Sequence, residues 1–271
     1  MERRDSWFEP KPRSTIGHQA TVSPKKARCC LLSVILFWEV SDRTLVIQKT
    51  RCYIFMLKNQ NDSSQRIVRQ VQKSFDLWAK NYDKGLSNFF FEINNNKTID
   101  FIGYRDNKLK ILDVGCGTGN LLINLHNKNP NIKLIGIDIS KEMIRVAKSK
   151  TEKLKNINFE MGDANNLPFE NEYFDYVVCS NSLHHHPHAL TSIKEMTRVL
   201  KKNGRLIIVD GFTNCCLRKI YFWIIRKIQG EEDVHRFSKI EMLNLFKQFD
   251  YKNIVQKNVA LVNLLTIGDK L

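Results

Sequence analysis

The chain has 271 residues, of which 42% are hydrophobic, so it can bury a packed core and is not a globally disordered protein. Its longest apolar run, Cys29–Trp38, is shorter than the ~20 residues that a membrane-spanning helix needs, and no integral membrane segment is predicted. The formal net charge of +15 keeps nucleic acids and anionic surfaces open as partners, beside small molecules.

The first 64 residues differ from the rest of the chain. The stretch up to Arg28 is polar, basic and interrupted by prolines, and short apolar bursts such as Leu31–Trp38 follow it. A secretory signal peptide is a poor match, because acidic residues dilute the charged start and no small-residue cleavage site follows Trp38. We predict that residues 1–64 form a basic N-terminal extension with little regular structure and that residues 65–271 form the folded domain.

Helical periodicity begins with Gln65–Asn81, where apolar side chains recur at intervals of four, four and three residues: Ile67, Val71, Phe75 and Trp78. We expect this face to pack against the core. A second helix is predicted over Leu86–Ile102.

Strands and helices then alternate. The predicted strands are Lys110–Val114, Lys133–Asp138, Asn158–Met161, Phe174–Cys179, Arg205–Asp210, Asn253–Ala260 and Leu264–Ile267. The predicted helices are Gly119–Asn127, Lys141–Lys150, Ala189–Leu200, Leu217–Ile228 and Lys239–Phe249. This order is typical of an α/β fold in which parallel strands are joined by right-handed helical crossovers and covered on both faces, with a final strand pair at the end.

A glycine-rich loop follows the first strand. Glycine occupies every second position, at Gly115, Gly117 and Gly119, so the backbone can turn tightly and a ligand can approach it closely. A helix follows, and its free N–H groups suit a carboxylate or phosphate. Asn120 stands where a dinucleotide-binding loop would need glycine, and Asp113 would repel a pyrophosphate. A ligand with a cationic part fits this loop better.

Two further acidic residues follow the next two strands. Asp138 ends the second strand, where a carboxylate can accept hydrogen bonds from both hydroxyls of a ribose. Asp163, followed by Ala164, comes just after the third strand, where a carboxylate can accept from the exocyclic amine of adenine. Each alone could be a helix cap or a turn residue. Acids at the ends of three successive strands, together with the loop, predict a nucleoside site at the carboxyl edge of the sheet.

With these motifs the chain resembles the class I S-adenosylmethionine-dependent methyltransferases, and within them the type 11 group. The resemblance covers about 200 residues from Phe75 onward and includes Asp113–Gly119, Asp138, Asp163–Ala164, Phe174–His185 and Arg198–Asp210. It implies a Rossmann-like, seven-stranded, mostly parallel sheet with helices on both faces and an antiparallel last strand pair. It also implies S-adenosyl-L-methionine as cofactor, with Ser180 at the position whose backbone touches the methionine part.

Four histidines follow the fourth strand: His184, His185, His186 and His188. Histidine can take a proton near neutral pH, which a methyl acceptor sometimes has to lose. We take His184 as the candidate base; packing against the cofactor loop or exposure to solvent is the alternative reading of these rings. The seven cysteines form no CxxC pair, and Cys116 and Cys179 sit where a disulfide is unsuited, so we predict reduced thiols, a cytoplasmic protein and no metal site.

The motifs leave the methyl acceptor open. The first hypothesis is a small-molecule methyltransferase, acting on oxygen, carbon or nitrogen. The second is a tRNA-base methyltransferase, because related wobble-uridine enzymes share the Leu-His-His-type motif and a basic balance. The third is a non-catalytic nucleoside-binding protein of the same fold. The entry helix Gln65–Asn81 and residues of Gly211–Ser238 are expected to cover the acceptor. The apolar stripe Tyr221–Ile225 within the second segment is expected to be one buried face of a helix, and a hydrophobic acceptor or a membrane surface is the alternative.

Overall fold

The computed structural model describes residues 66–84, 86–104, 106, 108–212, 236–259 and 262–271. The chain divides into two compact units, Met1–Leu57 and Lys58–Leu271, and all described residues belong to the second. The predicted extension 1–64 and the predicted helix Leu217–Ile228 lie outside the described residues, so they remain predictions.

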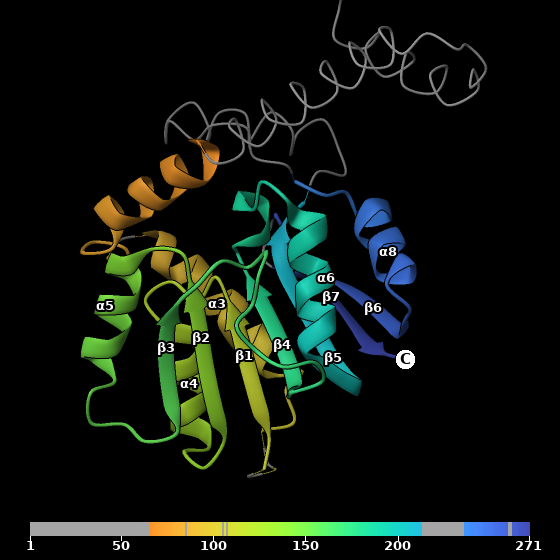
Figure 1. The fold of residues 1–271 in the computed structure, drawn as a ribbon, viewed down its shortest axis with the longest axis horizontal. Coiled ribbons are helices and arrows are strands. Elements are labelled where there is room, and N and C mark those ends of the chain that lie inside the picture. Colours follow the sequence, from red (N-terminus) through yellow and green to blue (C-terminus); the bar gives the residue numbers. More distant parts are fainter. Residues whose placement is uncertain (1–65, 85, 105, 107, 213–235, 260–261) are drawn as a thin grey trace, which may run out of the picture. The chain divides into compact units, whose positions relative to one another are not determined.

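The described unit is built on a seven-stranded sheet with the order β3-β2-β1-β4-β5-β7-β6 (Figure 1). The pairs among the first five strands are parallel, while β7 runs antiparallel to both β5 and β6. The strands are β1 (Lys110–Val114), β2 (Lys133–Asp138), β3 (Ile157–Met161), β4 (Phe174–Ser180), β5 (Leu200–Gly211), β6 (Tyr251–Val259) and β7 (Asn263–Lys270). The predicted α/β fold with an antiparallel last strand pair is therefore confirmed.

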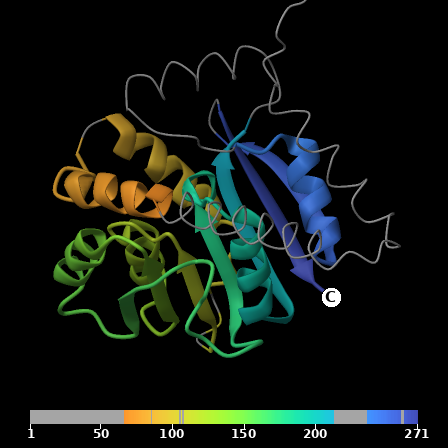
Figure 2. The same ribbon diagram turned by 45° about the horizontal axis from the view of Figure 1, so that its top comes forward.

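Helices cover both faces of the sheet. They are α3 (Leu86–Ile99), α4 (Asn120–Lys128), α5 (Lys141–Lys150), α6 (Ala189–Val199) and α8 (Lys239–Gln248), with a short 3₁₀ turn η1 (Leu183–His185). Residues 66–78 are also helical. Figure 1 shows α6 in front of the sheet with α3 and α4 behind it, and Figure 2 shows the strands between the two groups of helices.

The alternation of buried residues along the strands explains this layering. Leu112 and Val177 belong to the apolar core that α6 and α8 cover, whereas their neighbours Ile111 and Val178 belong to the core beneath α3, α4 and α5. Successive strand side chains point to opposite faces, so a run of consecutive apolar residues feeds two cores. All four are fully buried.

The predicted boundaries differ most at β5. Leu200, the last residue of the predicted helix, instead begins the strand and pairs with Phe174 of β4. Both side chains are fully buried in one core, and this long-range packing outweighs the local helical periodicity.

No helix in the described part of the chain is both long and apolar enough to cross a membrane.

The topology creates one switch point. From β1 the chain proceeds outward through β2 and β3, then returns to place β4 on the other side of β1. Ligands of open α/β sheets bind beyond the carboxyl ends of the strands at such a point. Figure 1 shows the helical segment 66–78, in orange, on this side of the sheet.

Gly119 gives a test of the loop that follows β1. Its φ is 81°, and a Cβ added there would lie 2.5 Å from the ring of Phe159. Gly119→Ala therefore combines left-handed strain with overpacking, and we expect it to lower the free energy of unfolding by roughly 2–4 kcal/mol. Gly117→Ala is the matched control, because φ is 53° but an added Cβ meets only Tyr82, at 3.7 Å. Thermal unfolding without ligand should show a clearly smaller loss for Gly117→Ala; equal losses would contradict the packing argument.

Candidate active site

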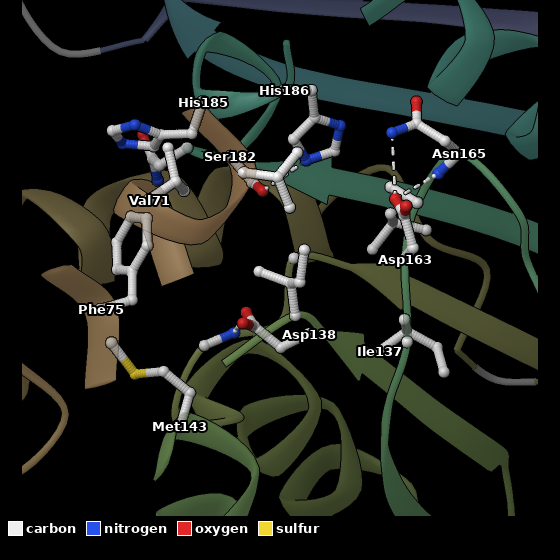
Figure 3. Close-up of a pocket in the computed structure, with 18 of the residues that line it drawn as sticks. Val71, Phe75, Ile137, Asp138, Met143, Asp163, Asn165, Ser182, His185 and His186 are labelled. Carbon is white, nitrogen blue, oxygen red and sulfur yellow. Dashed lines mark hydrogen bonds between the residues drawn. The ribbon is translucent and has the colours of Figure 1, made fainter. Parts of the chain in front are cut away.

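A cavity opens at the switch point, and its walls come from five separate stretches of the chain (Figure 3). They are the segment that contains residues 66–84, the glycine loop, the end of β2, the loop after β3 and the turn after β4. The residues that line it are Val68, Val71, Phe75, Tyr82, Val114, Gly115, Gly117, Ile137, Asp138, Ile139, Met143, Gly162, Asp163, Ala164, Asn165, Asn181, Ser182, His185, His186 and Pro187.

The glycine loop forms the floor of this cavity. The backbone N–H groups of Gly115 and Cys116 both donate to the carbonyl of Ile137, at 2.7 and 3.0 Å, which ties the loop to β2. A Cβ on Gly115 would lie 1.8 Å from Oγ of Ser182, so only glycine fits there. A Cβ on Gly117 would meet only the ring of Tyr82, at 3.7 Å, so this glycine leaves room for a ligand to come close to the backbone.

Asp138 lies at the centre of the cavity floor. Its two oxygens accept from the backbone N–H groups of Gly117 and Ser140, each at 2.8 Å. Burial raises the pKa of this carboxyl, while the hydrogen bonds from Ser140 and Gly117 partly oppose the rise. Each carboxylate oxygen can accept more than one hydrogen bond, so Asp138 keeps capacity for the hydroxyls of a ribose.

Asp113 lines a second, smaller cavity beside the first, together with Cys116, Thr118, Ser180 and Asn181. Its side chain is 2% exposed, and its Oδ1 has no hydrogen-bond partner among the described residues. Burial, and secondarily the negative charge of Asp138, raises the pKa of Asp113 to about 8. A buried carboxyl without a partner is costly, and an ammonium group placed in this cavity would relieve it.

Asp163 and Ala164 line the main cavity after β3. The Asp163 carboxylate accepts from the backbone N–H and the side-chain amide of Asn165, at 2.8 and 3.0 Å, and Figure 3 shows this pair at one end of the cavity. The predicted acids after three successive strands thus border two adjoining cavities. Carboxylates at these places can accept hydrogen bonds and balance a positive charge, which fits the hydroxyls, the amine and the ammonium group of S-adenosyl-L-methionine.

Gly119 occupies another place than expected. It lines neither cavity, and a Cβ added to it would lie 2.5 Å from the ring of Phe159. Ser180 lines the smaller cavity beside Asp113 and accepts a hydrogen bond from the Asn181 side chain at 3.2 Å. The described residues contain no cluster of three or more His, Cys, Asp or Glu suited to a metal ion.

The structure does not bring His184 to the lining of the main cavity. Its Nδ1 lies 2.5 Å from Asp210, and its backbone N–H donates to the same carboxylate at 2.8 Å. Burial would raise the pKa of Asp210, but the charge and hydrogen bonds of His184, together with the charge of Arg236, outweigh burial and hold this pKa below its usual value. His184 and Asp210 therefore anchor η1 to the end of β5.

His185 and His186 line the cavity instead. The His185 ring packs edge-to-face on Phe75 with centroids 4.9 Å apart, and Nε2 of His186 lies 3.0 Å from Oγ of Ser182. Burial lowers the pKa of His185 well below its usual value and that of His186 to about 4, so both rings are neutral at pH 7. The sequence places histidine at four of the five positions 184–188. It cannot show which of these side chains the turn directs into the cavity.

The segment 66–84 is fastened over the site by two carboxylates. Asp76 accepts from Oγ of Ser140, at 2.5 Å, and from the backbone of Glu142, at 3.2 Å, near the start of α5. Asp83 accepts from Oγ1 of Thr118 at 2.6 Å and from Nζ of Lys150 at 3.0 Å. The face that we expected to pack in the core therefore contributes Val71 and Phe75 to the cavity wall.

Asp113 provides a test that separates stability from binding. Its folded-state pKa of about 8 exceeds the ordinary 3.8, so the folded protein retains a proton that the unfolded chain loses. Between pH 3.8 and about pH 8 the folded state therefore binds more protons than the unfolded chain. The contribution of Asp113 to the free energy of unfolding falls by up to about 1.4 kcal/mol per pH unit as the pH rises through this range. We expect Asp113→Asn to gain melting temperature relative to wild type between pH 6 and pH 8.

The same substitution should weaken cofactor binding, because the cation loses its partner. Calorimetry in two buffers of different ionisation enthalpy should show proton release when S-adenosylmethionine binds the wild type at pH 7.5, and none for Asp113→Asn. A variant that is less stable than wild type at pH 8, with unchanged proton release, would contradict the role of Asp113.

Lys150 provides a test of the fastened segment. Its ammonium contacts Asp83, the carbonyl of Thr118 at 2.9 Å and Oδ1 of Asn120. Lys150→Met removes these contacts, and we expect S-adenosylhomocysteine to dissociate roughly 3- to 10-fold faster, since one partly exposed charged contact contributes about 1 kcal/mol. Arg145→Met on the same helix is the control, because that exposed side chain pairs, among the described residues, with Glu142 of its own helix. Stopped-flow release that is equal in the two variants would contradict the fastening role.

The comparisons with known proteins agree with this geometry. Residues 105–257, more than half of the chain, match the family described as methyltransferase domain. The demethylmenaquinone methyltransferases of several Staphylococcus aureus strains are 37% identical over 145 residues, which is 52% of this chain and 60% of theirs. The chain thus matches less than two thirds of the length of these relatives.

Solved structures show the same fold at low sequence identity. An S-adenosylmethionine-dependent methyltransferase from Thermotoga maritima has a TM-score of 0.60 at 19% identity, covering 73% of this chain and 99% of its own. One from Aquifex aeolicus has a TM-score of 0.55 at 20% identity, covering 72% and 98%. The chain therefore belongs to the methyltransferase domain family of class I Rossmann-like fold, and this membership implies S-adenosyl-L-methionine as its cofactor.

Proposed function

We propose that this protein transfers the methyl group of S-adenosyl-L-methionine to a small, largely apolar acceptor. The observation that carries the proposal is the composition of the main cavity, whose described lining contains no Lys or Arg. Nucleic-acid binding needs such cations at the phosphates. Apolar side chains from the segment 66–84 line the cavity instead, namely Val68, Val71 and Phe75.

We propose the following cofactor contacts. Asp138 accepts from the ribose hydroxyls, and Asp163 with Ala164 borders the adenine. Gly115 and Gly117 of the glycine loop support the methionine part, with Asp113 as partner of its ammonium group and Ser180 beside it, while Gly119 shapes the loop through its packing on Phe159. The orphaned oxygen of Asp113 and the room left at Gly117 support this placement.

The bound cofactor supplies an electrophilic methyl group on a positively charged sulfur. The protein's own part is to align an acceptor atom with that methyl group and to exclude water. The fastened segment 66–84 would serve both purposes, because its side chains close the cavity above the glycine loop. A proton acceptor is needed only for an acceptor that has to lose a proton.

The matched relatives support an aromatic acceptor, because their name assigns them demethylmenaquinone. We propose an acceptor of that chemical class, a flat apolar ring with ionisable hydroxyl groups. We further propose membership of the type 11 group, a cytoplasmic location in keeping with the buried free thiols of Cys116 and Cys179, and a catalytic domain over 65–271 with a basic extension before it.

The proposal is tested by following labelled methyl groups. Full-length protein is incubated with methyl-labelled S-adenosylmethionine and cell lysate, with and without nuclease, and separately with chemically reduced demethylmenaquinone. We expect label in the organic extract, unaffected by nuclease. Asp138→Ala is the negative control, since an unmatched polar pair in the ribose site should weaken cofactor binding by about 1–3 kcal/mol.

The competing functions give different results. Label that appears in RNA and disappears with nuclease would instead support a tRNA-base methyltransferase. Cofactor binding without transfer to any extract would support a non-catalytic nucleoside-binding protein.

A further inference from the structure

The main cavity has two chemically different ends. Figure 3 shows Asp163 and Asn165 at one end, and Val71, Phe75 and His185 at the other, with Asp138 and Ser182 between them. The first end carries the hydrogen-bonding groups proposed for adenosine. The second end is left for the acceptor, and among the described residues the cavity-lining rings beside Phe75 are those of His185 and Tyr82. Of these two, the imidazole of His185 carries a nitrogen that can accept a proton.

The His185 ring is held in place by packing. It stands edge-to-face on Phe75, at an interplanar angle of 87°, and its centroid lies 3.9 Å from that of the His184 ring. His184 is itself fixed by Asp210, so His185 rests on a rigid support. Because packing fixes the ring, His185 needs no hydrogen bond of its own to keep its nitrogens oriented toward a ligand.

The ring nitrogens of His185 are uncommitted, in contrast to those of its neighbours. No hydrogen bond joins them to another described residue, whereas His184 is bound by Asp210 and His186 lies against Ser182. Nδ1 of His186 lacks a partner among the described residues too, but the other ring nitrogen of His186 is engaged with Ser182. His188, at the start of α6, is exposed and lies outside the lining.

We propose that His185 contacts the methyl acceptor and takes its proton. The acceptor is an aromatic ring with a hydroxyl group, and the atom that receives the methyl group is the hydroxyl oxygen or a ring carbon conjugated with it. This inference rests on the proposed function. As the acceptor's nucleophilic atom bonds to the methyl carbon, the bond from that carbon to sulfur breaks and its electron pair stays on sulfur. The proton released by the acceptor goes to a His185 nitrogen and then to water.

The surroundings of His185 keep its ring unprotonated before the transfer. Burial, followed by the charges of His184, Arg236 and His186, keeps the pKa of His185 well below its ordinary value, so the ring is neutral and free to accept. A neutral ring also avoids repelling the sulfonium. Methyl transfer removes that positive charge, so the imidazolium is less unfavourable after the transfer than before it.

The acceptor class follows from the same end of the cavity. No carboxylate from the described residues lines it, so a protonated amine would lack a counter-charge, whereas an aromatic hydroxyl finds a proton acceptor beside an aromatic wall. A flat phenol or quinol is therefore the chemistry that His185 and Phe75 recognise.

The test uses full-length His185→Phe, which keeps a ring against Phe75 but has no nitrogen, and His185→Gln in case the first variant misfolds. We expect S-adenosylhomocysteine affinity within 3-fold of wild type by calorimetry, since His185 is not a cofactor contact. Affinity of the cofactor-product complex for 1-naphthol should fall at least 5-fold. Transfer to reduced demethylmenaquinone should fall about 100-fold or more, the usual range for loss of a general base.

His188→Asn is the matched control, and all these quantities should stay at wild-type values. In His185→Gly, added imidazole should restore part of the transfer, which a merely structural role would not allow. The assignment is overturned if His185→Phe retains 1-naphthol affinity and transfer rate, or if the wild type binds no 1-naphthol. A wild type that binds 1-naphthol but labels no acceptor would instead contradict the proposed function.

Discussion

The glycine loop between β1 and α4 is the constraint around which the rest of the site is built. Its glycines adopt positive φ, and its backbone is bound to Ile137 of β2. Ser182 from the turn after β4 packs directly on Gly115, and Thr118 holds Asp83 of the fastened segment. One short loop thereby joins the sheet, the histidine turn (residues 182–186) and the fastened segment 66–84. A change in the path of this loop would displace all three.

Two buried polar groups in the site lower the free energy of unfolding of the ligand-free protein. Asp113 is a buried carboxyl with an unpartnered oxygen, and Nδ1 of His186 is a buried nitrogen without a partner among the described residues. Such groups persist where a ligand supplies what the fold omits. Asp113 lines the smaller cavity, which is proposed for an ammonium group, and His186 lines the main cavity beside Ser182. The two unsatisfied groups therefore lie in the walls of the two adjoining cavities.

The histidine turn shows how neighbouring residues of one type acquire different roles. His184 is bound to Asp210, His185 packs between His184 and Phe75, and His186 lies on Ser182. The first two orientations depend on partners from other elements, β5 and the helical segment 66–78, and the third depends on Ser182 at the start of the turn itself. A 3₁₀ turn spreads successive side chains around its axis, which is why three adjacent rings can meet three different environments.

The sequence by itself determined the α/β class, the position of the glycine loop and the acids that end successive strands. These features are local, because apolar periodicity and residue type within a short window decide them. The order that inserts β7 between β5 and β6 came only from the tertiary structure, as did the packing role of Gly119 and the choice of cavity-lining histidine. The pairing of Asp83 with Lys150, 67 residues apart, belongs to the same group. Such features depend on which distant side chains the fold brings into contact, and no local pattern of residues encodes that contact.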